Sequence, residues 1–119
     1  MKLVSWYPVR DWVPPVDILE HDDQFIIRAE LPGVAKDSMD VHVEDGVLTL
    51  SGERKRETEA EDGAAFRTER IYGAFARSFT LPTTVDASKV SAAYKDGVLT
   101  VTVPKAEAAK PKKVEILAA

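Results

Sequence analysis

The side chains of this chain that could carry out chemistry are two histidines, each close to a pair of carboxylates. His21 is followed by Asp22–Asp23, and His42 stands two residues before Glu44–Asp45. Histidine and carboxylate groups ligate metal ions and act as general acids and bases in hydrolases. However, neither histidine has another ligand at the spacing of a metal motif, and both acidic pairs fall where turns are expected. We therefore expect exposed histidines, no metal site, no cofactor and no enzymatic activity.

The composition excludes several other functions. The sequence has no cysteine, so a disulfide, a thiolate nucleophile or a cysteine-ligated metal is impossible. Its net charge of −4 disfavours nucleic acid as a partner, because such binding needs a clustered basic face. No apolar run is long enough for a signal peptide or a membrane span, so we expect no membrane association and a cytoplasmic location. At 119 residues the chain is expected to form one domain.

Two copies of one hairpin pattern organise the chain. The first copy is Val43–Leu50 (VEDGVLTL), and the second is Tyr94–Val101 (YKDGVLTV). Asp-Gly supplies the positive φ angles that a tight turn between antiparallel strands requires. The alternation of leucine and valine with threonine after each turn is typical of a half-buried strand. The elements that position any functional residue are therefore expected to be β-strands.

Apolar and polar residues alternate along most of residues 14–104, and no segment has the 3.6-residue period of a helix. About seven or eight short strands, with turns about every eight to twelve residues, predict an all-β fold, an immunoglobulin-like β-sandwich. The Cys…Trp…Cys pattern of immunoglobulin domains is absent, so the likeness to that class concerns architecture alone.

A polar excursion interrupts the strands at residues 53–72. Its first ten residues, 53–62, are charged or polar apart from one alanine. Such a segment is too long for a hairpin loop in a compact domain, which suggests a function. Residues 66–71 then alternate like a short strand without a sequence neighbour to pair with. We expect this strand to pair with a sheet of another subunit.

Arg77 lies on the face of its strand that also carries Phe75 and Phe79. An unpaired buried charge would be very costly. The guanidinium is therefore expected either to meet a carboxylate at an interface or to reach the edge of the sheet.

Both ends of the chain carry apolar side chains outside the strand pattern. Residues 1–13 form an arm with three large aromatic residues, Trp6, Tyr7 and Trp12, expected either to cap the open end of the core or to pack on a partner or client. Residues 105–119 form a C-terminal extension, in which a linker of about nine residues reaches roughly 30 Å. Beyond the linker, Val114 and Ile116 point to one side of an extended chain and can fill adjacent holes in a groove. The alternative is a frayed terminus.

Several motifs, in order, resemble those of the small heat shock proteins, the α-crystallin/Hsp20 family. The segment through Ala93 and Asp96-Gly97-Val98-Leu99 is similar to the family signature A-x-x-x-[ND]-G-V-L, and Val114-Glu115-Ile116 is similar to its I-x-I/V tail motif. Further similar segments are Val16–Ile18, Ala29–Gly33, Gly73–Phe79 and Leu81-Pro82. The resemblance covers about residues 14–116.

The resemblance implies an ATP-independent molecular chaperone, a holdase that binds partly unfolded client proteins and prevents their aggregation under stress. It also implies a homodimer built by exchange of the strand in residues 53–72, and a higher homo-oligomer built by docking of the tail motif, Val114 and Ile116. The implied dimer interface consists of Phe66, Arg67, Glu69, Arg70 and Arg77. The implied groove for the tail or for clients consists of Val41, Val43, Val90, Ala92 and Tyr94. The implied client-binding arm carries Trp6, Tyr7 and Trp12.

The chain departs from the family at its start, where Val9–Asp11 runs straight into Trp12–Pro14. Family members usually carry a much longer N-terminal arm, so large assemblies and full client capacity are expected to be reduced, whether the short arm is natural or the result of a deletion. Two alternatives stay open. One is a CS/p23-like co-chaperone adaptor domain, favoured by a strictly monomeric state. The other is an enzyme or carbohydrate-binding module that uses the aromatic residues of the arm.

Overall fold

The computed structural model describes residues 12–55, 67 and 69–118. In this part of the chain there are seven β-strands and three short 3-10 helices. The strands are β1 (Val16–Glu20), β2 (Gln24–Glu30), β3 (Met39–Glu44), β4 (Val47–Arg54), β5 (Gly73–Thr80), β6 (Ser91–Lys95) and β7 (Val98–Pro104). The 3-10 helices are η2 (Lys36–Ser38), η3 (Ala87–Lys89) and η4 (Glu107–Ala109).

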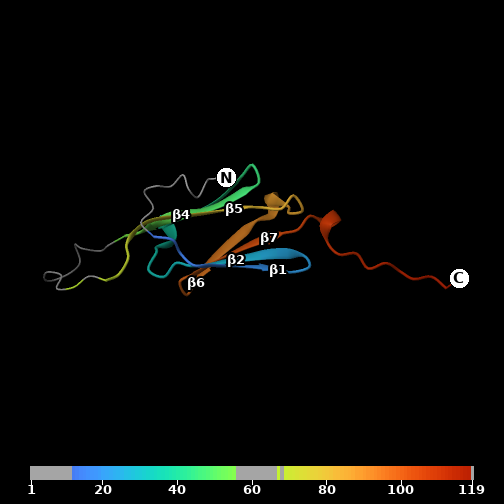
Figure 1. The fold of residues 1–119 in the computed structure, drawn as a ribbon, viewed down its shortest axis with the longest axis horizontal. Coiled ribbons are helices and arrows are strands. Elements are labelled where there is room, and N and C mark those ends of the chain that lie inside the picture. Colours follow the sequence, from blue (N-terminus) through green and yellow to red (C-terminus); the bar gives the residue numbers. More distant parts are fainter. Residues whose placement is uncertain (1–11, 56–66, 68, 119) are drawn as a thin grey trace.

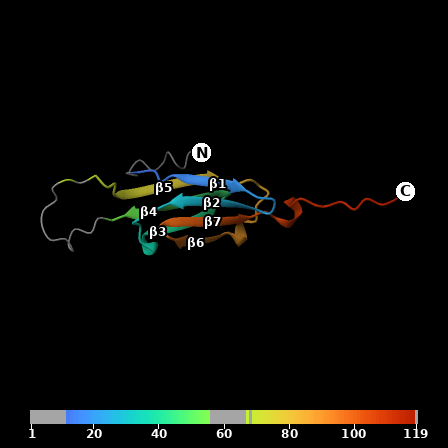
Figure 2. The same ribbon diagram turned by 90° about the horizontal axis from the view of Figure 1, so that it is seen from below.

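The strands form two antiparallel sheets stacked face to face (Figure 1). One sheet has four strands in the order β1-β2-β7-β6, and the other has three in the order β3-β4-β5. Figure 2 shows that β1 lies on the same side of the molecule as β5, while β6 lies on the same side as β3. The predicted β-sandwich is confirmed.

The core lies between the sheets and follows from the register of the strands. Ile27 lies opposite Val101, and Phe25 opposite Val103, so these side chains share the inner face of the wider sheet. The largest fully buried side chains are Ile27, Leu31, Leu48, Leu50, Val101, Val103 and Pro14. Burial of each such aliphatic side chain stabilises the fold by about 1.5–3 kcal/mol. The predicted alternation is therefore the pattern that builds the core.

Both predicted Asp-Gly turns are present. Asp45 and Gly46 have φ angles of 51° and 76°, and Asp96 and Gly97 have φ angles of 53° and 78°. Two consecutive residues with positive φ are the requirement of a type I′ turn, whose twist matches that of the flanking strands. These turns fix the β3–β4 and β6–β7 registers.

The requirement for glycine at position 52 comes from close packing of the backbone. Gly52 lies inside β4, and a Cβ atom there would stand 2.3 Å from the carbonyl oxygen of Ser38 and 2.9 Å from the Cα atom of Met39. Glycine is needed because the backbone at the start of β3 packs directly on β4. The strand then continues to Arg54, which pairs with Gly73, so the excursion begins after residue 54 and not at residue 53.

Candidate functional site

The two sheets differ in width, and inward-facing side chains are exposed at both edges of the wider one. Ile18 of β1 lies opposite Ile27, and Ala92 of β6 lies opposite Val101, so all four residues are on the inner face. Ile27 and Val101 are buried, whereas Ile18 is 54% exposed and Ala92 is also exposed. The three-stranded sheet is too narrow to cover the whole inner face of the four-stranded sheet. Apolar surface on β1 and β6 is therefore open to another chain.

The predicted groove residues come from β3, from β6 and from Val90 directly before β6, all on one side of the sandwich (Figure 2). The partly exposed side chains that pack against the core there are Val41, Val43, Val90 and Tyr94. The Tyr94 hydroxyl lies 2.7 Å from the carbonyl oxygen of Leu31 and 2.9 Å from that of Val34, and it can donate to either. These contacts fix the ring between the sheets, beside the exposed Ala92. The function of this surface as a groove for the tail stays a prediction.

The opposite side of the wider sheet ends in β1. This strand pairs with β2, and its other edge borders no strand among the described residues. Ile18 is exposed on its inner face, and Leu19 is exposed on its outer face. An edge strand with free backbone groups and apolar side chains on both faces is a template for pairing with a further strand.

The tail motif is exposed. Val114 is 74% exposed and Ile116 is 94% exposed, and residues 111–118 form neither strand nor helix. The preceding linker differs from the expectation of a free segment of nine residues. The amide of Lys105 donates to the carbonyl of Asp23 at 2.9 Å, and the amide of Ala106 donates to that of Thr84 at 2.7 Å. The unattached part of the chain therefore starts near Pro111.

Arg77 reaches the edge of the sheet, which is one of the two predicted outcomes. Its Nη1 donates a hydrogen bond of 3.0 Å to the carbonyl oxygen of Pro14, and its guanidinium carbon lies 5.2 Å from the centre of the Phe79 ring. Within the described residues, none of the ion pairs includes Arg77. The guanidinium stands directly before β1, next to the free edge of the wider sheet.

The predicted exchanged strand is described in part. Phe66 lies outside the described residues. Arg67 and Glu69 form an exposed ion pair of 2.9 Å, and the Arg70 guanidinium lies 5.3 Å from the centre of the Tyr72 ring. Residue 67 and residues 69–72 form no strand in this single chain. Because the expected pairing partner is a second subunit, strand exchange stays a prediction.

Trp12 packs on the sandwich. Its Nε1 donates a hydrogen bond of 3.0 Å to the carbonyl oxygen of Gly73, and its ring centre lies 5.3 Å from that of Phe75. For Trp12, this is the predicted capping of the open end of the core. Trp6 and Tyr7 lie outside the described residues. A role of the arm in client binding stays a prediction.

Two residues with clear structural roles, Arg54 and Lys105, were not predicted from the sequence. Arg54 lies with its guanidinium carbon 4.1 Å from the centre of the Trp12 ring, and its Nη1 donates to the carbonyl of Ile71 at 3.0 Å. Lys105 forms an ion pair of 2.8 Å with Glu20. Arg54 occupies an inward-facing position of β4, two residues after Gly52, and this position in the alternation could have indicated its structural role. No sequence pattern indicates the role of Lys105, because that residue begins a run rich in lysine and alanine.

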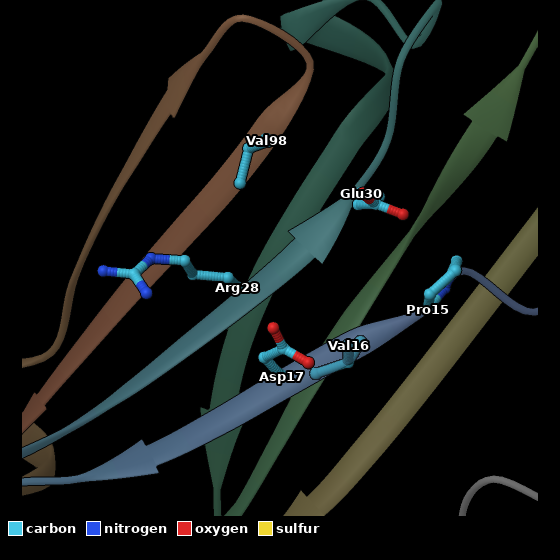
Figure 3. Close-up of a pocket in the computed structure, with 6 residues that line it drawn as sticks. All are labelled: Pro15, Val16, Asp17, Arg28, Glu30 and Val98. Carbon is cyan, nitrogen blue, oxygen red and sulfur yellow. The ribbon is translucent and has the colours of Figure 1, made fainter.

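The residues with possible catalytic chemistry form no catalytic set. His42 lies with its Nε2 3.3 Å from Oε1 of Glu44 on the surface. Among the described residues no group of histidine and carboxylate side chains could hold a metal ion. Figure 3 shows a shallow hollow lined by Pro15, Val16, Asp17, Arg28, Glu30 and Val98, which contains no histidine or hydroxyl group.

In the described part of the chain, no helix is long and apolar enough to cross a membrane.

Comparison with known proteins gives a consistent family. Residues 17–117 match the Hsp20/alpha crystallin family. The chain is 40% identical over 103 residues to small heat shock protein C4 of Rickettsia felis, a match that covers 87% of this chain and 63% of that protein. The chain thus spans less than two thirds of the length of this relative.

Two solved structures are also similar. Heat shock protein 16.0 from Schizosaccharomyces pombe is 37% identical, with a TM-score of 0.76, and the match covers 91% of this chain and 99% of that one. A small heat-shock protein from Xylella fastidiosa, with a distinct high order structure, is 38% identical, with a TM-score of 0.75 and the same coverage. These matches confirm the predicted family resemblance and the α-crystallin type of sandwich. The relatives are heat shock proteins and not enzymes.

Proposed function

Because the chain belongs to the Hsp20/alpha crystallin family, we propose that it is an ATP-independent molecular chaperone that binds partly unfolded proteins and prevents their aggregation under stress. The observation that carries the proposal is the exposed apolar surface on the inner faces of β1 and β6. Partly unfolded proteins present extended apolar segments. Sheet edges bind such segments through backbone hydrogen bonds, while adjacent apolar surface accepts their side chains.

The dimer forms by strand exchange, in which residues 66–71 of one chain pair with the free edge of β1 in a second copy. The exposed Ile18 and Leu19 offer apolar contacts on both faces of that edge, and Ile71 is exposed at the end of the exchanged segment. Arg77 supports this arrangement, because its bond to the carbonyl of Pro14 holds the guanidinium beside the start of β1.

Higher assembly uses the other edge. Val114 and Ile116 of one chain pack between β6 and β3 of a second copy, where the small Ala92 leaves inner-face surface uncovered. The exposure of the tail motif supports this proposal, because two such side chains gain from burial about 1.5–3 kcal/mol each. The Xylella fastidiosa relative has a distinct high order structure, which agrees with assembly beyond a dimer.

Clients compete for the same apolar edges and for the N-terminal arm that carries Trp6 and Tyr7. The absence of cysteine agrees with a reducing compartment, the cytoplasm. On this proposal, client binding is a matter of exposed apolar surface, without a cofactor or a nucleotide.

The proposal is tested by following the light scattering of a heat- or reductant-unfolded model client, without ATP, as the protein is added. We expect suppression of aggregation at equimolar subunit. An unchanged scattering trace at that ratio contradicts the chaperone proposal. A strictly monomeric protein that suppresses nothing but binds a larger chaperone points instead to a co-chaperone adaptor.

A further inference from the structure

The start of the C-terminal extension is built into the sandwich, although the sequence there is rich in lysine and alanine. Lys105 is the central residue of this attachment. Its side chain is only 11% exposed, its Nζ lies 2.8 Å from Oε2 of Glu20, and the same atom lies 5.2 Å from the centre of the Phe25 ring. A lysine that is mostly buried, paired and stacked is held in one position.

Backbone hydrogen bonds attach the same segment on its other side. Lys105 forms an isolated antiparallel β-bridge with Val85. Its backbone amide donates to the backbone carbonyl of Asp23, in the turn between β1 and β2. The amide of Ala106 donates to Thr84. The first two residues of the extension are therefore fixed between the β1–β2 turn and the loop before η3, by bonds that a free linker lacks.

The next residues form one 3-10 turn, η4, and a short ionic network. The amide of Ala109 donates to the carbonyl of Ala106 at 2.9 Å, and Nζ of Lys110 lies 2.6 Å from Oε2 of Glu107. This pairing lowers the pKa of Glu107, and the nearby Lys89 lowers it further. Nζ of Lys89 itself lies 4.0 Å from Oδ2 of Asp86. Charges of alternating sign thus connect η4 to η3.

Beyond Lys110 these contacts end. Pro111 has no amide hydrogen to donate, and within the described part of the chain no hydrogen bond joins residues 111–118 to the sandwich. Only Pro111, Lys112 and Lys113 separate the attached segment from Val114. Their reach is about 10 Å, in place of the roughly 30 Å of a free nine-residue linker.

We propose that residues 105–110 are a strut, anchored by Lys105, that fixes the direction in which the tail motif leaves the sandwich. Figure 1 shows the extension leaving one end of the sandwich and continuing away from it. The strut thereby presents Val114 and Ile116 to a second copy at a fixed angle. This inference rests on the proposed docking of the tail, and its test separates the two.

The strut is tested by single-cysteine spin labelling. Because the chain has no native cysteine, the label attaches only at the introduced position. A nitroxide at the exposed position 108 is compared with one at position 115, both in a Val114→Ala/Ile116→Ala background so that tail docking plays no part. We expect slow motion at 108 and fast motion at 115. Equal, fast motion at both positions overturns the strut.

The role of Lys105 is tested by Lys105→Met, which keeps the length of the side chain and removes its charge, with Lys112→Met as the matched control beyond the strut. We expect Lys105→Met to mobilise the label at 108 and to raise amide exchange at residue 106 about tenfold, the effect of losing one charge-assisted hydrogen bond. Lys112→Met leaves both unchanged. Equal effects of the two substitutions contradict a special role of Lys105.

Assembly is read from native mass spectra of the same variants with an intact tail motif. We expect a broader distribution of masses for Lys105→Met than for Lys112→Met, because a freed tail docks at many angles. Identical distributions overturn the directing role of the strut, even if the label shows that the strut exists. If instead Val114→Ala/Ile116→Ala leaves the wild-type mass unchanged, the proposed tail docking itself fails.

Discussion

Arg54 stacks on Trp12, with its guanidinium carbon 4.1 Å from the centre of the indole ring. The two residues join the end of β4 to the segment before β1, and the Nε of Arg54 is buried without a hydrogen-bond partner. The indole face and the carbonyl oxygen of Ile71 are therefore the contacts that hold this cation, and a cation–π contact contributes about 0.5–2 kcal/mol. The pair closes one end of the sandwich.

The first prediction concerns Trp12. Trp12→Ala removes the hydrogen bond to Gly73, the contact with Phe75 and the ring beneath Arg54. We expect the free energy of unfolding to fall by about 2–4 kcal/mol, somewhat less than for a fully buried tryptophan. Chemical denaturation measures it, with the exposed neighbour Val13→Ala as the control. A loss below about 1 kcal/mol, with strongly reduced client binding, shows instead that Trp12 serves the client-binding arm.

The second prediction concerns Gly52. Gly52→Ala places a Cβ atom 2.3 Å from the carbonyl oxygen of Ser38, and β3 must shift away from β4. We expect a destabilisation of about 1–3 kcal/mol from this overpacking, measured by thermal or chemical unfolding. Gly46→Ala is the matched control, because its Cβ meets no atom within 4 Å and only its positive φ is strained. Equal stability of Gly52→Ala and the wild type contradicts the close packing of β3 on β4.

The third prediction concerns strand exchange. Deletion of residues 57–71 removes the segment that is proposed to pair with β1 of a second copy. We expect a folded monomer, because β4 and β5 already pair from Val47 to Arg54 without that segment. Sedimentation and circular dichroism check mass and fold. A persistent dimer places the interface elsewhere.

The fourth prediction concerns the pH range of the strut. The hydrogen bond from Lys110 lowers the pKa of Glu107 below its ordinary 4.5, and the same bond raises the pKa of Lys110 above 10.5. Since Glu107 has its lowered pKa only in the attached state, its contribution is present above pH 4.5 and is lost as the pH falls through the lowered pKa. The contribution of Lys110 is present below pH 10.5 and is lost as the pH rises through the raised pKa.

A spin label at position 108 should therefore stay ordered between these limits and loosen outside them. The neighbouring charges that take part are Lys89, Asp86 and Asp23, and the pKa of Asp86 is itself lowered by a hydrogen bond from Ser88. Glu107→Gln should abolish the loosening at acid pH that comes from protonation of Glu107. The loosening at alkaline pH should then be limited to what the other neighbour of Lys110, Asp23, causes. Loosening near neutral pH contradicts this assignment.

The strands and their turns were predictable because they depend on local patterns. Asp45-Gly46 and Asp96-Gly97 specify their turns by backbone geometry alone, and the alternation around Leu48 and Val101 specifies which face is buried. The requirement for glycine at position 52 was not predictable, because it comes from the backbone of Ser38 and Met39, which the local sequence does not reveal.

The candidate site was predictable only in part, because exposure depends on how the sheets overlap. The sequence pattern marks Ile18 and Ala92 as inward-facing, like Ile27 and Val101, and nothing local distinguishes the covered pair from the uncovered one. Lys105 was missed for a related reason. Its partners, Glu20 and Phe25, lie about eighty residues earlier in the chain, and the contact exists only once β2 and β7 pair.

The most direct measurement is the binding of a peptide with the sequence of residues 111–118 to the Val114→Ala/Ile116→Ala variant, followed by NMR of the backbone amides. Docking on the uncovered edge predicts chemical-shift changes at Ala92, Tyr94, Val41 and Val43. A peptide that carries alanine at both motif positions is predicted to cause none. The absence of shifts, or shifts confined to β1 around Ile18, would contradict the claim that the β6 and β3 side receives the tail.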